Sequence, residues 1–149
     1  MFERILALFG PKPSKTELPP AEARFAIGAL MVRTAMADRA YLFEEVEEID
    51  RVLAKLYGLN PIEAAKMRAQ CEKLEHEMPR TLDLAKIIGD AVGQPEREAA
   101  VSAMWAVVYA DGRRHENEDV LVSRIEGLLG VDTETCLRLK EEQRIAHRA

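Results

Sequence analysis

Two stretches of the sequence share one pattern: an Ala-Asp turn, a run of acidic residues, and an amphipathic segment that ends at glycine. The second copy is VVYADGRRHENEDVLVSRIEGLLG, over 107–130, and the first, looser copy is TAMADRAYLFEEVEEIDRVLAKLYGL, over 34–59. The Ala-Asp pairs begin at positions 37 and 110, 73 apart, and the closing glycines stand at 58 and 130, 72 apart. A repeat of this size predicts two three-helix units packed face to face with approximate two-fold symmetry. One residue is expected to be missing from the second turn.

Length and composition favour one globular, all-α domain. The chain has 149 residues, of which 48% are hydrophobic and 32% charged, a balance typical of a folded chain with a sizeable core. Glycines and prolines are few, and no segment alternates strictly between apolar and polar residues, as a half-buried strand would. We therefore predict a compact bundle of about seven helices in two pseudo-two-fold-related three-helix units.

Helix start and stop signals support this division. Asn60, Pro61 and Glu63 have the residue types and spacing of an N-cap, a first-turn proline and a capping-box glutamate. Gly58 and Gly130 are each followed by an apolar residue. We expect both glycines to end helices in the left-handed conformation, with the apolar residue packing back.

Five other residues carry packing predictions. Thr81 is expected to cap a short helix, and Leu137 is expected to face the core from the last helix. Gly28 lies among alanines, which indicates close packing against another helix. Cys71 and Cys136 show no metal-ligand or redox spacing, so we interpret them as small buried residues in a reducing compartment.

The first part of the chain is predicted to be a separate segment, residues 1–19, ahead of a helical domain over residues 20–149. Four residues at helical spacing give it one apolar face: Phe2, Ile5, Leu6 and Phe9. A proline-rich tether follows them. The short helix is expected to fold back onto the domain. Contact with a membrane or a partner is the alternative, although a single arginine is a poor lipid anchor.

Charge and hydropathy narrow the partners. The net charge is −5 and the pI about 5.3, whereas proteins that bind duplex nucleic acid carry a basic face. The acidity favours cations or basic protein surfaces as partners. No apolar run is long enough to cross a bilayer, and no signal-peptide pattern is present at the N-terminus. We therefore expect a cytoplasmic protein that does not bind nucleic acid, with a membrane-peripheral location as the alternative.

Acidic residues gather at both Ala-Asp turns and suggest a cation site. Carboxylate oxygens are the ligands that Ca²⁺, Mg²⁺ and Mn²⁺ prefer. The candidate ligands in the first copy are Asp38, Glu44, Glu45 and Glu48, and those in the second copy are Asp111, Glu116, Glu118 and Asp119.

Two observations oppose a metal site and support a purely structural role. A calcium-binding EF-hand loop that began at Asp111 would place Arg113, His115 and Val122 where it needs oxygen ligands or glycine. Arg113 and Arg114 also repel a cation. Acidic residues at a helix N-terminus are favoured by the helix dipole in any case, so both interpretations remain open at the level of the sequence.

The repeated motif resembles the TerB-like family, which is named for the bacterial tellurite-resistance protein TerB. In the second copy the resemblance rests on Tyr109-Ala110-Asp111-Gly112, on the acidic turn, and on Leu128-Leu129-Gly130; in the first copy it rests on Ala37-Asp38 and Tyr57-Gly58-Leu59. A similar domain occurs in a membrane-anchored DnaJ-like co-chaperone. The first copy departs from the family pattern at Arg39, where glycine is usual. The resemblance covers roughly residues 20 to 145.

This resemblance implies a bacterial, cytoplasmic, non-catalytic protein of the tellurite or stress response. It also implies an acidic surface that binds a protein partner, with a divalent cation as a further candidate ligand, and no cofactor beyond such a cation. Two alternatives remain: a membrane-peripheral scaffold docked by its N-terminal helix, and an enzyme that uses paired carboxylates across the two-fold axis. The last alternative requires the two acidic turns to approach each other.

Overall fold

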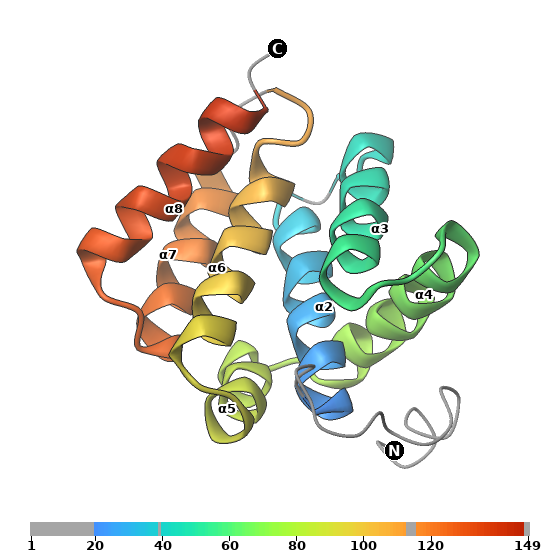
Figure 1. The fold of residues 1–149 in the computed structure, drawn as a ribbon, viewed down its shortest axis with the longest axis horizontal. Coiled ribbons are helices and arrows are strands. Elements are labelled where there is room, and N and C mark those ends of the chain that lie inside the picture. Colours follow the sequence, from blue (N-terminus) through green and yellow to red (C-terminus); the bar gives the residue numbers. More distant parts are fainter. Residues whose placement is uncertain (1–19, 39, 113–115, 148–149) are drawn as a thin grey trace.

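A computed structural model of the protein describes residues 20–38, 40–112 and 116–147, which fold into an all-α bundle (Figure 1). The described part contains seven helices: α2 (Ala21–Ala35), α3 (Phe43–Tyr57), α4 (Pro61–Glu77), α5 (Thr81–Ala91), α6 (Gln94–Val108), α7 (Glu116–Leu129) and α8 (Thr133–Ala146). The predicted all-α class and helix number are confirmed for this part of the chain. The short helix predicted over Phe2, Ile5, Leu6 and Phe9 lies outside the described residues.

The helices repeat as two similar triplets, α2–α3–α4 and α6–α7–α8. α2 and α6 have 15 residues each, and both ends of α6 are displaced by 73 positions from those of α2. These two helices pack on each other at the centre of the bundle, α3 packs on α6, and α7 packs on α2. In each of these last two contacts, the second helix of one triplet packs on the first helix of the other. The two triplets are therefore related by the approximate two-fold axis that the sequence repeat predicts.

α5 is the element that breaks this symmetry. It connects the two triplets and packs against α2 and α7, at the lower end of the bundle in Figure 1. Its inward residues are Leu84, Ala85 and Ile88, which are all buried. Among the described residues no equivalent helix covers α6 and α3.

The predicted helix stops and the capping box are confirmed. Gly58 and Gly130 end α3 and α7 with φ angles of 66° and 72°, a conformation that costs glycine little because it has no Cβ. The Asn60 side chain accepts a hydrogen bond from the Glu63 backbone N–H at 2.8 Å. The Glu63 carboxylate in turn accepts from the Asn60 N–H at 3.0 Å.

Three local predictions are wrong. Thr81 is the first residue of α5 rather than its N-cap, because its buried hydroxyl accepts a hydrogen bond from Arg33 at 3.3 Å. Leu137 is 62% exposed, because α8 turns its Cys136 and Leu139 side towards the core. The missing residue does not belong to the turn: α3 and α7 begin equally far after their Ala-Asp pairs, and α7 has 14 residues where α3 has 15.

The core confirms the predicted close packing at Gly28 and the burial of both cysteines. A Cβ on Gly28 would lie 2.3 Å from the Cys71 sulfur, so α2 and α4 approach closely only because this residue lacks a side chain. Cys71 and Cys136 are both buried free thiols. Trp105 of α6 is also buried, and its indole N–H donates to Glu126 at 2.7 Å.

Candidate functional site

The candidate site is a pair of buried glutamates, one from each half of the molecule. Glu45 is the third residue of α3, and Glu118 is the third residue of α7. Their exposed fractions are 0% and 1%, which is unusual for charged side chains. Glu45 folds back over the start of its helix and accepts a hydrogen bond from the Leu42 backbone N–H at 2.9 Å.

The two acidic turns meet at this pair. The pKa of Glu118 is raised to about 10, first by burial, then by the hydrogen-bonding carboxyl of Glu45, and then by the negative charges of Glu45, Asp38 and Asp111. Two carboxylates held together in a buried place do not both ionise. Burial and proximity therefore oppose the ionisation of both groups and favour a proton shared between the two halves. The sequence could not establish that the turns approach each other.

The donor chemistry of this place suits a hard cation. Both carboxylate oxygens of Glu118 are shielded from solvent, and apart from the Glu45 carboxyl no group of the described residues hydrogen-bonds to them. Carboxylate oxygens are preferred ligands of Ca²⁺, Mg²⁺ and Mn²⁺. Within the described ranges, however, no three acidic, histidine or cysteine side chains stand ready to hold a metal ion. A cation would have to displace the proton and draw the flanking carboxylates inwards.

The other predicted ligands lie in different surroundings. Glu44, directly before Glu45, and Glu116, two residues before Glu118, are exposed, and Asp119 is half-buried. Glu48 is buried, but its carboxylate interacts with Arg51 and His147. His115 and the two arginines before it lie outside the described residues.

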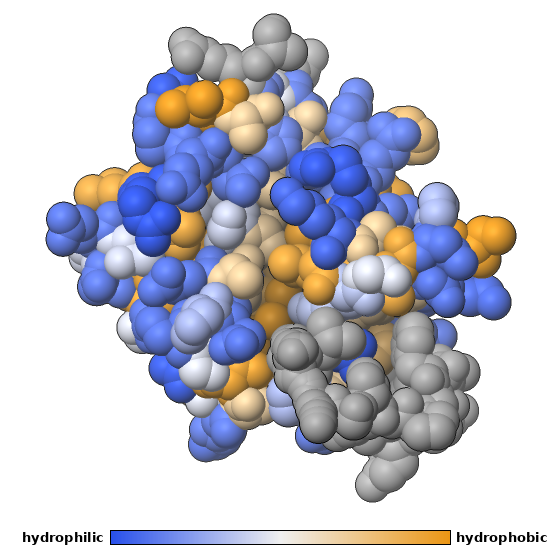
Figure 2. All heavy atoms as spheres, in the orientation of Figure 1, coloured by the Kyte–Doolittle hydropathy of each residue, from blue (hydrophilic) through white to orange (hydrophobic). Residues whose placement is uncertain are grey.

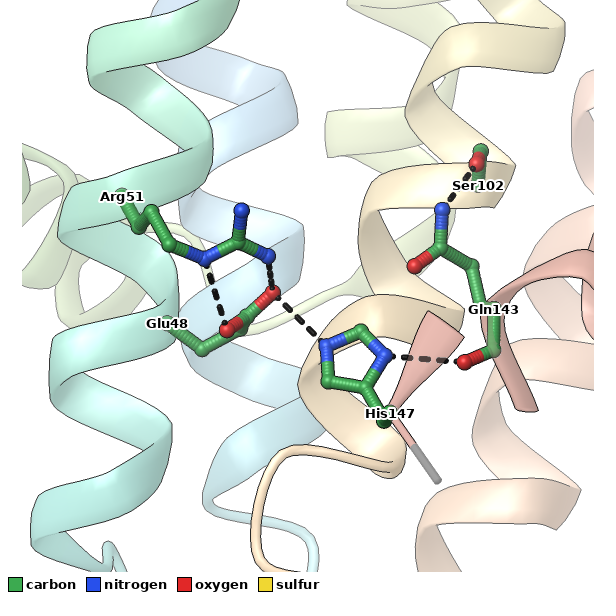
Figure 3. A network of polar contacts seen from close by, with 5 residues as sticks. All are labelled: Glu48, Arg51, Ser102, Gln143 and His147. Carbon is green, nitrogen blue, oxygen red and sulfur yellow. Dashed lines mark hydrogen bonds and ion pairs between the residues drawn. The ribbon is translucent and has the colours of Figure 1, made fainter. Parts of the chain in front are cut away.

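Glu48 joins α3 to the end of α8 (Figure 3). Its carboxylate accepts hydrogen bonds from the Arg51 guanidinium and lies 3.0 Å from the His147 Nε2 atom. The His147 Nδ1 atom is 2.8 Å from the Gln143 carbonyl oxygen. Both ring nitrogens of His147 therefore face oxygen atoms, one from a carbonyl and one from a carboxylate. Gln143 also donates to Ser102 of α6 at 3.0 Å.

Beside this network a groove separates α3 from α6 and α8. It has a volume of about 500 Å³, and apolar side chains line a hollow between hydrophilic flanks in the centre of the face shown in Figure 2. Its apolar lining includes Val52, Leu56, Ala99, Ala103 and Ala106. Sequence analysis missed the groove, because alanines at helical spacing are equally consistent with tight helix packing.

The helices were also compared with the length and hydropathy that a membrane span requires. None of the helices in the described ranges is both long enough and apolar enough to cross a bilayer. The proposed membrane or partner contacts at Phe2, Ile5, Leu6 and Phe9 lie outside those ranges.

Together, the duplicated helix triplet and the carboxyl pair at its two-fold axis define a class of all-α repeat domains with paired acidic turns. The model of the family described as tellurite resistance protein TerB matches residues 24–141. The chain belongs to this family.

Two further comparisons concern solved structures and curated proteins. Among solved structures, a protein of unknown function from Porphyromonas gingivalis W83 is similar, with a TM-score of 0.64 and 16% identity, over 91% of this chain and 97% of that chain. At this identity the likeness concerns the fold alone. The comparison with curated proteins finds no match.

Proposed function

We propose that this chain is a non-catalytic TerB-family module that takes up a divalent cation between its two halves, in a cytoplasmic tellurite or stress response. The observation that carries this proposal is the buried Glu45–Glu118 pair, with Asp38 and Asp111 close enough to raise the pKa of Glu118. These four carboxyl groups would supply hard oxygen ligands from both Ala-Asp turns. Bound there, the cation would stabilise the contact between the two halves.

The burial of the pair favours binding over catalysis. Paired carboxyl groups with separated pKa values perform acid-base chemistry in enzymes, but such groups must reach a substrate. Glu45 and Glu118 are at most 1% exposed, which suits a small ion better than an organic substrate. This argument supports a structural or regulatory cation.

Thermal unfolding with and without cations tests the proposal. The full chain is melted alone and with excess Ca²⁺, Mg²⁺, Mn²⁺ or Zn²⁺. A specific ion at 100 times its Kd is expected to stabilise the fold by about 2.7 kcal/mol. Glu118→Gln should abolish this ion-induced increase, whereas Glu116→Gln, on the exposed side of the same helix turn, should keep it.

A comparison of each variant with itself and a pH series make this experiment more specific. Each variant is compared with itself, with and without the ion, so that the effect of the substitution on stability cancels. The ion-induced increase is expected to grow between pH 6 and 8, because cation and proton compete for the same oxygens. If no ion raises the melting temperature of the wild-type chain, or if Glu118→Gln keeps the increase, the cation proposal fails.

A protein partner is a second candidate for the surface around the same turns. Phe43 is 70% exposed and Val120 69%, and each lies beside an acidic residue near the start of its helix. Exposed apolar side chains flanked by charge are typical of interaction sites. The partner would present a basic surface with an apolar centre.

A differential capture experiment tests this second candidate. Binding by the wild-type chain is compared with Phe43→Ala and with Leu137→Ala, which removes a similarly exposed apolar side chain from α8. A partner of the turns should be lost with the first variant and retained with the second, and should dissociate at high salt. Equal capture by both variants would contradict this surface.

A further inference from the structure

The groove between α3, α6 and α8 is equivalent, by the repeat, to the place that α5 occupies. α5 packs against α2 and α7, and the equivalents of these helices are α6 and α3. The lining of α6 includes Ala99, Ala103 and Ala106. With the displacement of 73 that relates α2 to α6, their equivalents in α2 are Ala26, Leu30 and Arg33. α2 packs against α5, with Arg33 donating to Thr81 of that helix, and Ala26 and Leu30 are both fully buried.

α5 indicates what such a groove accepts. It is an 11-residue helix that inserts one apolar side, with Leu84 and Ile88 buried. Polar contacts fix both of its ends: Arg33 donates to the Thr81 hydroxyl at 3.3 Å, and Arg97 donates to the Gly89 carbonyl at 2.6 Å. The equivalent groove has the same kind of apolar lining and a charged margin from Arg51 and Lys55. Its geometry therefore suits a short amphipathic helix.

The chain itself contains a second short amphipathic segment of this size. Residues 1–9 place Phe2, Ile5, Leu6 and Phe9 at the spacing of one helical face. The intervening residues 11–20 can span roughly 31 Å as an extended, proline-rich tether. α2, with 15 residues, is only about 22 Å long. The start of α2, the end of α3 and the start of α6 all lie towards the same end of the molecule (Figure 1). A tether of this length is therefore long enough to reach the end of the groove that Leu56 and Ala99 line.

We propose that residues 1–9 dock as a helix in the groove between α3, α6 and α8 of the same chain. The segment takes there the position that α5 takes in the other half and completes the two-fold arrangement. Burial of its four apolar side chains drives the docking. This inference does not depend on the cation proposal, because the groove is lined by none of the four carboxyl groups proposed to bind the ion.

Disulfide trapping in the full chain tests the docking. One cysteine replaces Leu6, and a second replaces either Ala99, inside the groove, or Ala91, at the exposed end of α5. Because α5 packs against α2, Ala91 is a stringent control for mere proximity to the tether. The native thiols are buried, and burial raises the pKa of Cys136 to about 12, so they react slowly.

The expected result is an intramolecular disulfide that forms about tenfold faster with position 99 than with position 91, because docking raises the local thiol concentration. Adding Ile5→Asp to the Leu6/Ala99 cysteine pair should reduce its rate to that of the control pair. Equal rates for the two pairs, or a fast rate that survives Ile5→Asp, overturn the proposal.

Two other occupants are distinguished by the same samples. Disulfides that form mainly between chains would assign the groove to a second copy and overturn docking within one chain. Sedimentation with phosphatidylcholine–phosphatidylserine vesicles, together with no preference for position 99, would assign residues 1–9 to a lipid surface and also overturn it. Circular dichroism of each variant verifies that the bundle stays folded.

Discussion

α2 and α6 occupy equivalent places in the two halves, yet their surroundings differ. α2 is covered by α4 on one side and by α5 on another, whereas the matching side of α6 borders the groove. Where α2 has Gly28 and Arg33, α6 has Val101 and Ala106. The first half therefore combines a close helix contact with a buried ionic anchor, and the second half replaces both with ordinary apolar packing.

The difference shows which features the repeat itself requires. Both halves keep a glycine stop and a buried glutamate in the third position of the second helix. These shared features form the two-fold axis and its carboxyl pair. Of the features found in only one half, Gly28 allows the close contact of α2 with α4, and Arg33 joins α2 to the end of α4 and the start of α5.

Among the substitutions that test this difference between the halves, the largest effect is expected from the loss of Arg33, which joins α2 to α4 and α5. Arg33 donates to the Glu75 carboxylate at 3.1 Å, to the Glu75 and Met78 carbonyls, and to Thr81. Arg33→Ala leaves Glu75 largely buried without its partner and should lower the free energy of unfolding by roughly 3–5 kcal/mol. Urea unfolding followed by circular dichroism measures this loss. A loss below about 1 kcal/mol would mean that the Arg33 contacts add little to the packing of α2 against α4 and α5.

The next largest effect is expected at the close contact of α2 with α4. Gly28→Ala places a Cβ against the Cys71 sulfur, and overpacking of this kind costs about 1–3 kcal/mol even after the gain in helix propensity. Cys71→Ala should relieve much of that cost. A double-mutant cycle by urea unfolding measures the coupling. Purely additive effects would show that α2 and α4 can separate slightly without loss.

The shared carboxyl pair gives a pH-dependent prediction. In the folded chain the pKa of Glu118 is about 10, above the ordinary glutamate value of 4.5, so the native state holds its proton more tightly than the unfolded state. The stabilising effect of this proton is complete below pH 4.5 and is lost as the pH rises towards 10. Each bound proton changes stability by at most about 1.4 kcal/mol per pH unit.

Glu118→Gln tests this directly, because an amide imitates the protonated acid. In the absence of divalent cations the variant should be more stable than wild type at pH 8, by roughly 1–3 kcal/mol, and its stability should depend less on pH. Glu116→Gln serves as the exposed control and should keep the wild-type slope. Parallel pH profiles for Glu118→Gln and wild type would argue against a retained proton.

The smallest effect is expected at the margin of the groove, where an arginine has the same partner type as Arg33 but little burial. Arg51 pairs with Glu48, and its side chain is 58% exposed. Arg51→Ala should therefore cost at most about 1 kcal/mol in urea unfolding, less at high salt. A loss equal to that of Arg33→Ala would show that the Glu48–His147 contact, and with it the end of α8, depends on Arg51.

Much of the fold could be predicted because its signals are local. The glycine stops and the Asn60 capping box depend on residues within a few positions of one another, and the repeat revealed the two-fold plan. Leu137 was misjudged because an apolar residue on a short terminal helix does not reveal which side meets the core. The burial of Cys71 was predicted because its spacing fits neither a metal site nor a redox motif, but its contact with Gly28 was not predicted.

The candidate site could be predicted only in part. Composition identified the acidic turns, but Glu44 and Glu45 are indistinguishable until the exact start of α3 is known. The third position of the helix turns Glu45 inwards and leaves its neighbour in solvent. The meeting of the two turns is a tertiary contact that no local pattern encodes. The groove arises from the absence of an α5 equivalent among the described residues, which only the structure reveals.

A proton held between Glu45 and Glu118 would make the chain one unit less negative than its formal charge of −5. A cation that took its place would release that proton to the solvent. The heat of cation binding would then vary with the ionisation enthalpy of the buffer, and the slope of that dependence would count the protons released. Calorimetry in two buffers would thus detect the buried pair without altering a residue.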